Sequence, residues 1–205
     1  MSGAADHDAG QVTMGENADT DDHELVRRAG AGDRLAASEL IIRHTDKVMG
    51  LCYRMLGERA AAEDAVQETF LRLWKHAHKW RDEGAKIETW LYRVAKNLCL
   101  DRLRKTGREV GEDAAPEQAD HADGAEQSMI RADRARAVEA ALMRLPERQR
   151  AAISLCHFQE LSNIEAAEVM NVSVEAMESL LSRGRRTLKK VLSPQREELM
   201  EGGLS

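Results

Sequence analysis

The segment over residues 87–105, IETWLYRVAKNLCLDRLRK, constrains the fold most, because it combines an apolar stripe with aromatic and basic side chains on one helical pattern. Ile87, Leu91, Val94 and Leu98 recur at the three-and-four spacing of a helix that buries one face. The side chains outside this stripe are predicted to face outward: Trp90, Tyr92, Arg93, Lys96, Asn97, Arg102, Arg104 and Lys105.

Such a helix could bind nucleic acid. It can dock on a core through its stripe and still present flat rings and cations, which suit unpaired bases and phosphate backbones. A purely structural explanation competes with this one, because cations in a last helical turn suit the helix dipole and aromatic residues are usually core. The segment alone does not decide between them.

The composition favours helices throughout the chain. Only two Phe and two Tyr occur among 205 residues, and Pro occurs three times, at positions 116, 146 and 194. No run of β-branched residues alternates over the length of a strand. We therefore expect an all-α protein of two small helical domains joined by a flexible acidic linker.

The net charge of −6 argues by itself against a nucleic-acid partner, but the charge is unevenly distributed. Residues 1–23 carry six acids and no Lys or Arg, and residues 106–133 carry eight acids against two Lys or Arg. Residues 24–105 carry 17 Lys or Arg against 12 acids, and residues 141–192 carry eight against six, which gives +5 and +2. The two predicted domains are thus mildly basic.

Neither a metal site nor a membrane segment is predicted. Cys52, Cys99 and Cys156 are odd in number and widely spaced, and Cys156 and His157 point apart in a helix. They are interpreted as small apolar residues of a reduced, cytoplasmic protein. The N-terminus lacks the features of a signal peptide, and no apolar run reaches membrane-spanning length. We expect no metal, no cofactor and no membrane insertion of the chain itself.

Changes in composition divide the chain into five segments. Residues 1–21 read as a disordered acidic extension and residues 106–125 as a flexible linker. Residues 22–105 and 126–192 carry the helical patterns of two domains, and residues 193–205 form a C-terminal tail.

Four helices are predicted in the first domain. Asp22 is expected to cap a short one, and a long second one carries Ile41 and His44 on its buried side and ends at Gly57. His44 is interpreted as a packing residue rather than a ligand. The third helix starts near Ala60, and a loop then leads to the aromatic and basic segment.

A helix-turn-helix is predicted in the second domain. Residues 162–165 form a capping box that opens a short helix, and Asn171 suits the left-handed position of a tight turn. Ser173 can cap a longer helix, in which residues 183–190 contain five cations and no acid. The alternative is a plain helical hairpin, but cap, turn and charge together favour a helix-turn-helix that enters the major groove.

These motifs resemble the extracytoplasmic-function (ECF) subfamily of bacterial RNA polymerase sigma factors. The resemblance rests on AAEDAVQETFLRLW, on ETWLYRVAKNLCLDRLRK, and on RLPERQRAAISLCHFQELSNIEAAEVMNVSVEAMESLLSRGRRTL after an acidic linker. It covers about residues 22–192. It implies that region two docks on the clamp of RNA polymerase core and melts the −10 promoter element. Region four then sits on the polymerase flap and reads the −35 element.

The resemblance also implies roles for individual residues. The polymerase clamp would contact Asp64, Gln67, Glu68, Phe70 and Leu71. The −10 strand would be handled by Trp80, Lys86, Trp90, Tyr92, Arg93, Lys96, Asn97, Asp101, Arg102 and Arg104. The −35 element would be read by Ser173, Glu175, Ala176, Ser179, Arg183, Arg185 and Arg186.

One stretch departs from the family pattern. Where members often have Gly-Thr-Val-Lys-Ser-Arg, residues 175–180 read EAMESL, so two cations are missing. Glu can still accept from cytosine N4 and Ala can touch a thymine methyl, while phosphate contacts would shift to Arg183, Arg185 and Arg186.

The sequence therefore predicts a sigma factor for a restricted, stress-response gene set. It is expected to be cytoplasmic and held inactive by an anti-sigma factor, which could itself be bound to the inner membrane. A helix-turn-helix regulator acting without polymerase is the alternative. An enzyme is disfavoured, because no arrangement of catalytic residues is apparent.

Overall fold

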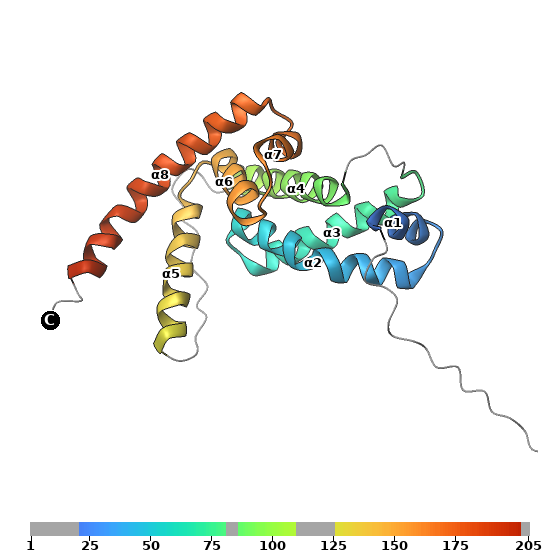
Figure 1. Ribbon diagram of the computed structural model, residues 1–205, viewed down its shortest axis with the longest axis horizontal. Coiled ribbons are helices and arrows are strands. Elements are labelled where there is room, and N and C mark those ends of the chain that lie inside the picture. Colours follow the sequence, from blue (N-terminus) through green and yellow to red (C-terminus); the bar gives the residue numbers. More distant parts are fainter. Residues whose placement is uncertain (1–20, 81–85, 110–125, 202–205) are drawn as a thin grey trace, which may run out of the picture.

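The computed structural model describes residues 21–80, 86–109 and 126–201, and every element in those ranges is a helix (Figure 1). The predicted all-α class is confirmed. The acidic extension predicted over residues 1–21 and the linker predicted over residues 106–125 lie almost entirely outside the described residues. The helices, in chain order, are α1 (Asp22–Gly30), α2 (Arg34–Leu56), α3 (Arg59–Ala77), α4 (Ile87–Glu109), α5 (Glu126–Met143), α6 (Glu147–Ile153), the π-helix η1 (Ser154–Phe158), α7 (Asn163–Met170) and α8 (Val174–Glu201).

Local signals set most of the helix ends in the first region. The Asp33 side chain accepts from two backbone N–H groups at the start of α2, and Gly57 ends this helix in the left-handed conformation with φ of 76°. The cap of α1 is Asp21, and the prediction of Asp22 was wrong by one residue. Asp22 instead accepts from His44 Nε2 at 2.8 Å, so His44 is a buried, hydrogen-bonded packing residue as predicted.

Helices α2, α3 and α4 enclose the core of the first region. Its largest fully buried aliphatic side chains include Leu40, Leu51, Leu73 and Leu91, which come from all three helices. Ile41 was expected on the buried side of α2 but is 40% exposed. Each helical residue is rotated by about 100° from the one before, so the residue after a fully buried Leu40 turns towards solvent.

The second region contains the predicted helix-turn-helix. Ser162 and Glu165 form the reciprocal capping box of α7, and Asn171 adopts the left-handed conformation at φ of 54°. The Ser173 hydroxyl accepts from the Ala176 N–H at 3.2 Å and caps α8. Buried Met177 packs the start of α8 into the core. Helix α8 continues to Glu201, further than the end predicted at residue 192.

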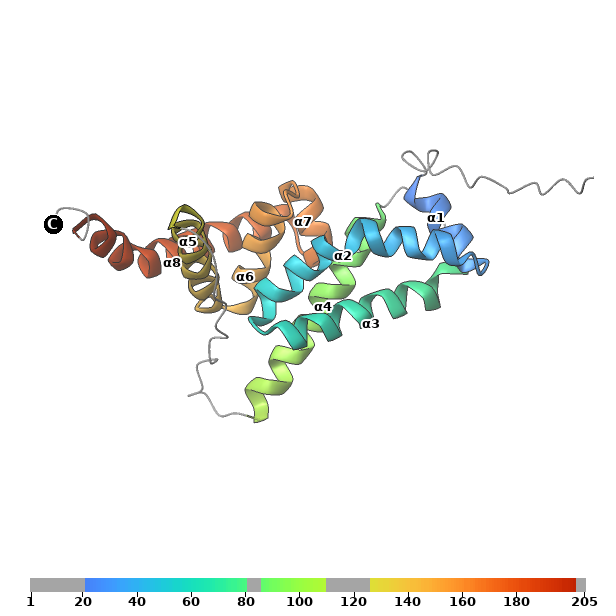
Figure 2. The ribbon, with the colours of Figure 1, turned by 90° about the horizontal axis from the view of Figure 1, so that it is seen from below.

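The two regions pack on each other and share one core cluster. In Figures 1 and 2, α6 and α7 lie against one end of the first region, while the C-terminal half of α8 extends away from it. Arg150 of α6 is buried and donates to the Met55 carbonyl of α2 at 2.6 Å and to the Leu145 carbonyl at 3.3 Å. This side chain joins the end of α2 to the second region.

The π-helix η1 supplies a second joint that the sequence pattern did not predict. It brings the Phe158 ring under the Arg54 guanidinium of α2, with 4.5 Å between the guanidinium carbon and the ring centroid. Gln159, which follows it, donates to the Lys47 carbonyl at 3.1 Å and accepts from the Tyr92 hydroxyl at 2.9 Å. The second region is thereby fixed on both α2 and α4.

Candidate nucleic-acid interface

Aromatic rings gather where α3 ends and α4 begins. The ring centroids of His76 and Trp90 lie 5.7 Å apart with nearly parallel planes, and Trp80 meets Trp90 edge to face at 6.0 Å. The Trp80 indole N–H donates to His23 Nδ1 at 3.1 Å. Trp80 and Trp90 were predicted to handle a DNA strand, and the fold brings them together with His76 and His23, which sequence reasoning missed. No spacing rule marks His23, which lies 57 positions from Trp80. His76 precedes Trp80 by four residues, one helical turn, and this spacing is the signal that could have found it.

Two residues expected to face outward on α4 are buried. Tyr92 is 1% exposed, and burial raises the pKa of its phenol. Lys96 is 5% exposed. Burial lowers the pKa of its ammonium, and Arg93, Arg148 and Arg104 lower it further. The outward prediction for Tyr92 and Lys96 was wrong, because the second region covers this side of α4.

Carboxylates of α7 hold two further cations of the predicted −10 set. Glu165 accepts from Lys86 Nζ at 2.7 Å, and Glu168 accepts from Arg93 at 2.9 Å. The hydrogen bond from Lys86, followed by those from Ser162, lowers the pKa of Glu165 to about 2. These carboxylates thus neutralise two of the cations that were predicted to handle the −10 strand.

The remaining predicted residues of α4 lie towards its C-terminal end. Arg102 donates to the Ala61 carbonyl at 2.7 Å and reaches Asp64 at 3.3 Å, so it ties α4 to the start of α3. Arg104 pairs with Asp101 at 3.3 Å, and Asn97 is exposed. This part of the α4 surface is therefore accessible but partly neutralised.

The polymerase-facing residues predicted on α3 differ in accessibility. Asp64 and Gln67 are exposed, Leu71 is 50% exposed, and Glu68 forms an exposed ion pair with Arg72 at 2.9 Å. Phe70 is only 6% exposed and stacks on Trp74, with ring centroids 6.1 Å apart. Phe70 thus supports this surface from the core.

The recognition residues predicted at the start of α8 lie on an open face. Ser173, Glu175 and Ala176 are exposed, and Ser179 is half-buried. Arg183, Arg185 and Arg186 are also exposed, and within the described parts of the chain none of the three forms an ion pair with a carboxylate. Gly184 allows α8 to cross α6 closely, since a Cβ there would lie 2.9 Å from Ile153 Cγ1.

This geometry is typical of a DNA-binding protein. A helix carrying cations and a cluster of stacked rings stands beside a helix-turn-helix with an open basic face, an arrangement suited to binding DNA at two separate points. In the ranges that the structure describes, no helix could cross a membrane and no group of three or more His, Cys, Asp or Glu could hold a metal ion.

Comparisons with known proteins identify the family. The family model described as Sigma-70 region 2 matches residues 40–109, and that described as Sigma-70, region 4 matches residues 135–188. The chain is 33% identical over 177 residues to the ECF RNA polymerase sigma factor SigW of Bacillus subtilis (strain 168), a match covering 82% of this chain and 94% of SigW. It is 32% identical over 183 residues to the RNA polymerase sigma-H factor of Pseudomonas aeruginosa, covering 84% and 94% of the two chains.

Solved structures agree with this relationship. CnrH, in its complex with the cytosolic domain of CnrY, superposes with a TM-score of 0.65 at 25% identity, and the match covers 84% of this chain and 97% of CnrH. The sigma factor RpoE from Bartonella quintana has the same fold, with a TM-score of 0.63. The chain belongs to the ECF subfamily of the sigma-70 family, as its motifs predicted. It is a sigma factor that binds RNA polymerase core and recognises promoter DNA.

Residues at the joint between the two regions were missed by sequence reasoning. Arg148, Arg150, Gln159 and Glu168 carry no signal that a pattern along the chain could reveal, and Glu165 was marked only as a residue of the capping box. The partners of Glu168, Glu165, Arg150 and Gln159 in the first region are 67 to 112 positions away. Only the packing of the two regions brings these groups together.

Proposed function

We propose that this sigma factor binds the unpaired −10 strand along α4, reads the −35 element with the start of α8, and docks on the polymerase clamp through the exposed face of α3. The observation that carries the −10 assignment is the aromatic cluster of Trp80, Trp90 and His76, which stands beside Lys86 and Arg93. Rings that stack on unpaired bases and cations that hold phosphates are the two elements of single-strand binding.

Strand separation then requires binding and no chemical reaction. Each base stacked on a protein ring contributes about 1–3 kcal/mol, which offsets the cost of unpairing it. The proposed role for the side chains of α4 is to bind the melted strand more tightly than the duplex, so that binding shifts the equilibrium towards the open promoter. We therefore propose that the chain acts by binding and is not an enzyme.

The −35 element would be read by a short set of side chains. Glu175 can accept from cytosine N4, and Ala176 can contact a thymine methyl group. Arg183, Arg185 and Arg186 supply phosphate contacts further along α8, because they are exposed and carry no carboxylate partner in the described structure. These three arginines would replace the phosphate contacts of the two cations that family members often have within residues 175–180 and that this chain lacks.

The packing of the two regions bears on how −10 binding occurs. The −35 face of α8 is open, whereas Tyr92 and Lys96 lie under the second region. We propose that α7 must separate from α4 before a strand can reach these two residues. RNA polymerase would favour that separation by binding each region at a different site, the clamp for region two and the flap for region four.

Further partners follow from membership of the subfamily. We propose that an anti-sigma factor restrains this chain by covering its polymerase-binding surfaces. We also propose that the genes transcribed with this sigma factor belong to a restricted stress response. Because its partners are RNA polymerase and chromosomal DNA, its place of action is the cytoplasm, either free or held at the inner membrane by a membrane-bound anti-sigma factor.

Run-off transcription with bacterial core polymerase and a genomic promoter library tests these roles. Promoter-specific transcripts from the wild type should fall with Trp90→Ala, with Asp64→Ala/Gln67→Ala and with Arg183→Ala/Arg186→Ala. Arg27→Ala/Arg34→Ala is the control, since it removes two exposed cations, of α1 and α2, that have no proposed role. If the wild type gives no transcripts and does not bind core, yet shifts duplex DNA by itself, the chain is instead a regulator that acts without polymerase.

A further inference from the structure

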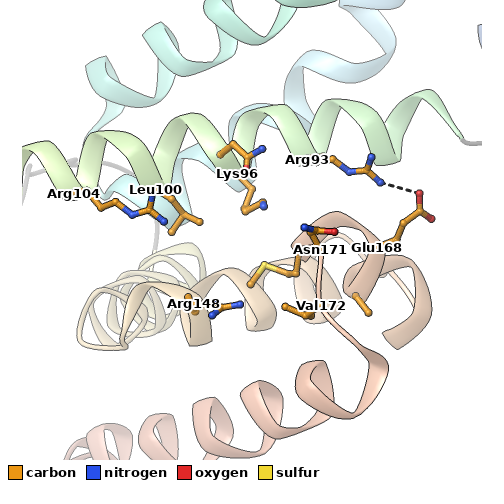
Figure 3. Close-up of a pocket in the computed structure, with 11 residues that line it drawn as sticks. Arg93, Lys96, Leu100, Arg104, Arg148, Glu168, Asn171 and Val172 are labelled. Carbon is orange, nitrogen blue, oxygen red and sulfur yellow. Dashed lines mark hydrogen bonds and ion pairs between the residues drawn. The ribbon is translucent and has the colours of Figure 1, made fainter.

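A cleft of about 640 Å³ lies between the two regions (Figure 3). Helix α4 forms one wall, with Arg93, Lys96 and Arg104, and Arg148 of α6 and Glu168 of α7 lie opposite. Figure 3 shows Lys96 extending from α4 and Arg148 from α6 towards the same space. The cleft thus places four cations from both regions around one cavity.

The charge of this cleft is not balanced. Its lining has four cations and a single carboxylate, that of Glu168, which pairs with Arg93. Arg104 pairs with Asp101, which does not line the cleft. In the described residues, Lys96 and Arg148 have no ion-pair partner.

The buried position of Lys96 makes this imbalance costly. Lys96 is 5% exposed as a residue, so its ammonium reaches solvent only through the cleft and is weakly screened from the neighbouring cations. Burial lowers its pKa, and Arg93, Arg148 and Arg104 lower it further. An anion between Lys96 and Arg148 would relieve the repulsion.

The four separated cations around the cleft favour a ligand with more than one negative charge. A single carboxylate could neutralise only one of the separated cations, whereas linked phosphates can reach several of them. Arginine guanidinium groups also match phosphate geometry through paired hydrogen bonds. The volume is within the range of about 300–1,000 Å³ that is typical of sites for small molecules.

We propose that this cleft binds a small polyanion with two or more linked phosphates, either a nucleoside polyphosphate or an inorganic polyphosphate. The ligand contacts Lys96 of the first region and Arg148 of the second, so it stabilises their packed arrangement. Because the same Lys96 is assigned to the −10 strand, the ligand and the melted promoter compete. This regulatory consequence depends on the proposed roles of α4, but binding of the polyanion does not.

Isothermal titration calorimetry of the full chain with sodium tripolyphosphate, without magnesium, tests the proposal. We expect one ligand per chain and a dissociation constant that increases about ten-fold in Arg148→Gln, which loses one charged contact. The control is Arg34→Gln, a matched change of an exposed arginine at the opposite end of α2 from Met55, and its affinity should stay close to that of the wild type. A parallel titration with ATP separates the two sources, since tighter binding of ATP assigns the site to a nucleotide.

Other results would overturn the proposal. If Arg148→Gln and Arg34→Gln weaken tripolyphosphate binding equally, the binding is only a general attraction of anions to a basic surface. If the affinity of Arg148→Gln is unchanged, the cleft is not the binding site. Lys96→Met, which keeps the apolar stem, gives a second and independent loss of charge, and circular dichroism checks that each variant is folded. Since no polymerase or promoter is present, failure here leaves the transcription results unaffected, and Arg148→Gln should still support run-off transcription.

Discussion

The two faces proposed to bind DNA, on α4 and on α8, have the same chemistry and opposite exposure. On α8, Arg183, Arg185 and Arg186 are exposed and lack carboxylate partners in the described structure. On α4, by contrast, Arg93 is paired with a carboxylate of α7 and Lys96 is buried. Basic residues at helical spacing therefore do not by themselves make an available DNA-binding surface. What matters is whether another part of the chain already occupies them.

Two kinds of contact hold the second region on α4 and α2, and we call the side of α4 beneath it the covered face. Contacts of buried side chains, such as Arg150 and Tyr92, are shielded from water, and removing them leaves polar groups without partners. Ion pairs such as Lys86 with Glu165 lie at the edge, where solvent and salt weaken them. The following predictions test this order, from the strongest contact to the weakest.

Arg150→Ala should have the largest effect on stability. It removes the hydrogen bonds to the buried carbonyls of Met55 and Leu145, and we expect the free energy of unfolding to fall by about 3 kcal/mol. Urea denaturation followed by circular dichroism measures this change. Arg186→Ala, on the open face, should change stability by less than about 0.5 kcal/mol. Similar losses in the two variants would contradict the difference between the covered and the open face.

Tyr92→Phe should have an intermediate effect. The change keeps the buried ring but removes the hydroxyl that donates to Gln159, which should cost about 1 kcal/mol. The matched control is Tyr53→Phe, because the Tyr53 hydroxyl has no hydrogen-bond partner in the described part of the chain. Thermal unfolding compares the two, and a melting temperature lowered equally in both would argue against the joint at Gln159.

Glu168→Gln should weaken the packing of α7 on α4 only slightly. Both members of its ion pair with Arg93 are at least 41% exposed, so the pair should contribute about 0.5 kcal/mol and less at high salt. Hydrogen exchange of the α4 amides should become faster at low salt by about two-fold. The control is Glu178→Gln, which changes an exposed carboxylate on α8 that has no ion-pair partner among the described residues. Exchange that is unchanged in Glu168→Gln, or that does not depend on salt, would exclude a role for this pair.

The last prediction concerns pH. The pKa of Glu165 is lowered from 4.5 to about 2, so its contribution to stability is complete above about pH 4.5 and is lost as the pH falls towards about 2. The melting temperature of the wild type should exceed that of Glu165→Gln near neutral pH, and the difference should shrink below about pH 4.5. A difference that stays constant down to about pH 3 would mean that the ionised carboxylate is not the stabilising group.

The sequence by itself determined the helices, the helix-turn-helix and the family. Asp33, Gly57 and Asn171 start or end helices through hydrogen bonds and backbone angles within a few residues, so their effect is readable along the chain. The Ser162 and Glu165 capping box is equally local. The placement of Trp80 and Trp90 beside the same loop followed from the helical pattern in the same way.

Only the tertiary structure decided which face of α4 is free. The apolar stripe predicted that Tyr92 and Lys96 would point outward, but burial depends on every surface that meets a helix. The residue that accepts from Tyr92 lies 67 positions further along the chain. Hydrophobic periodicity reports that one side of a helix is apolar, and it cannot report that a second domain covers a polar side through charge pairs and hydrogen bonds. The cleft between Lys96 and Arg148 arises from this packing alone.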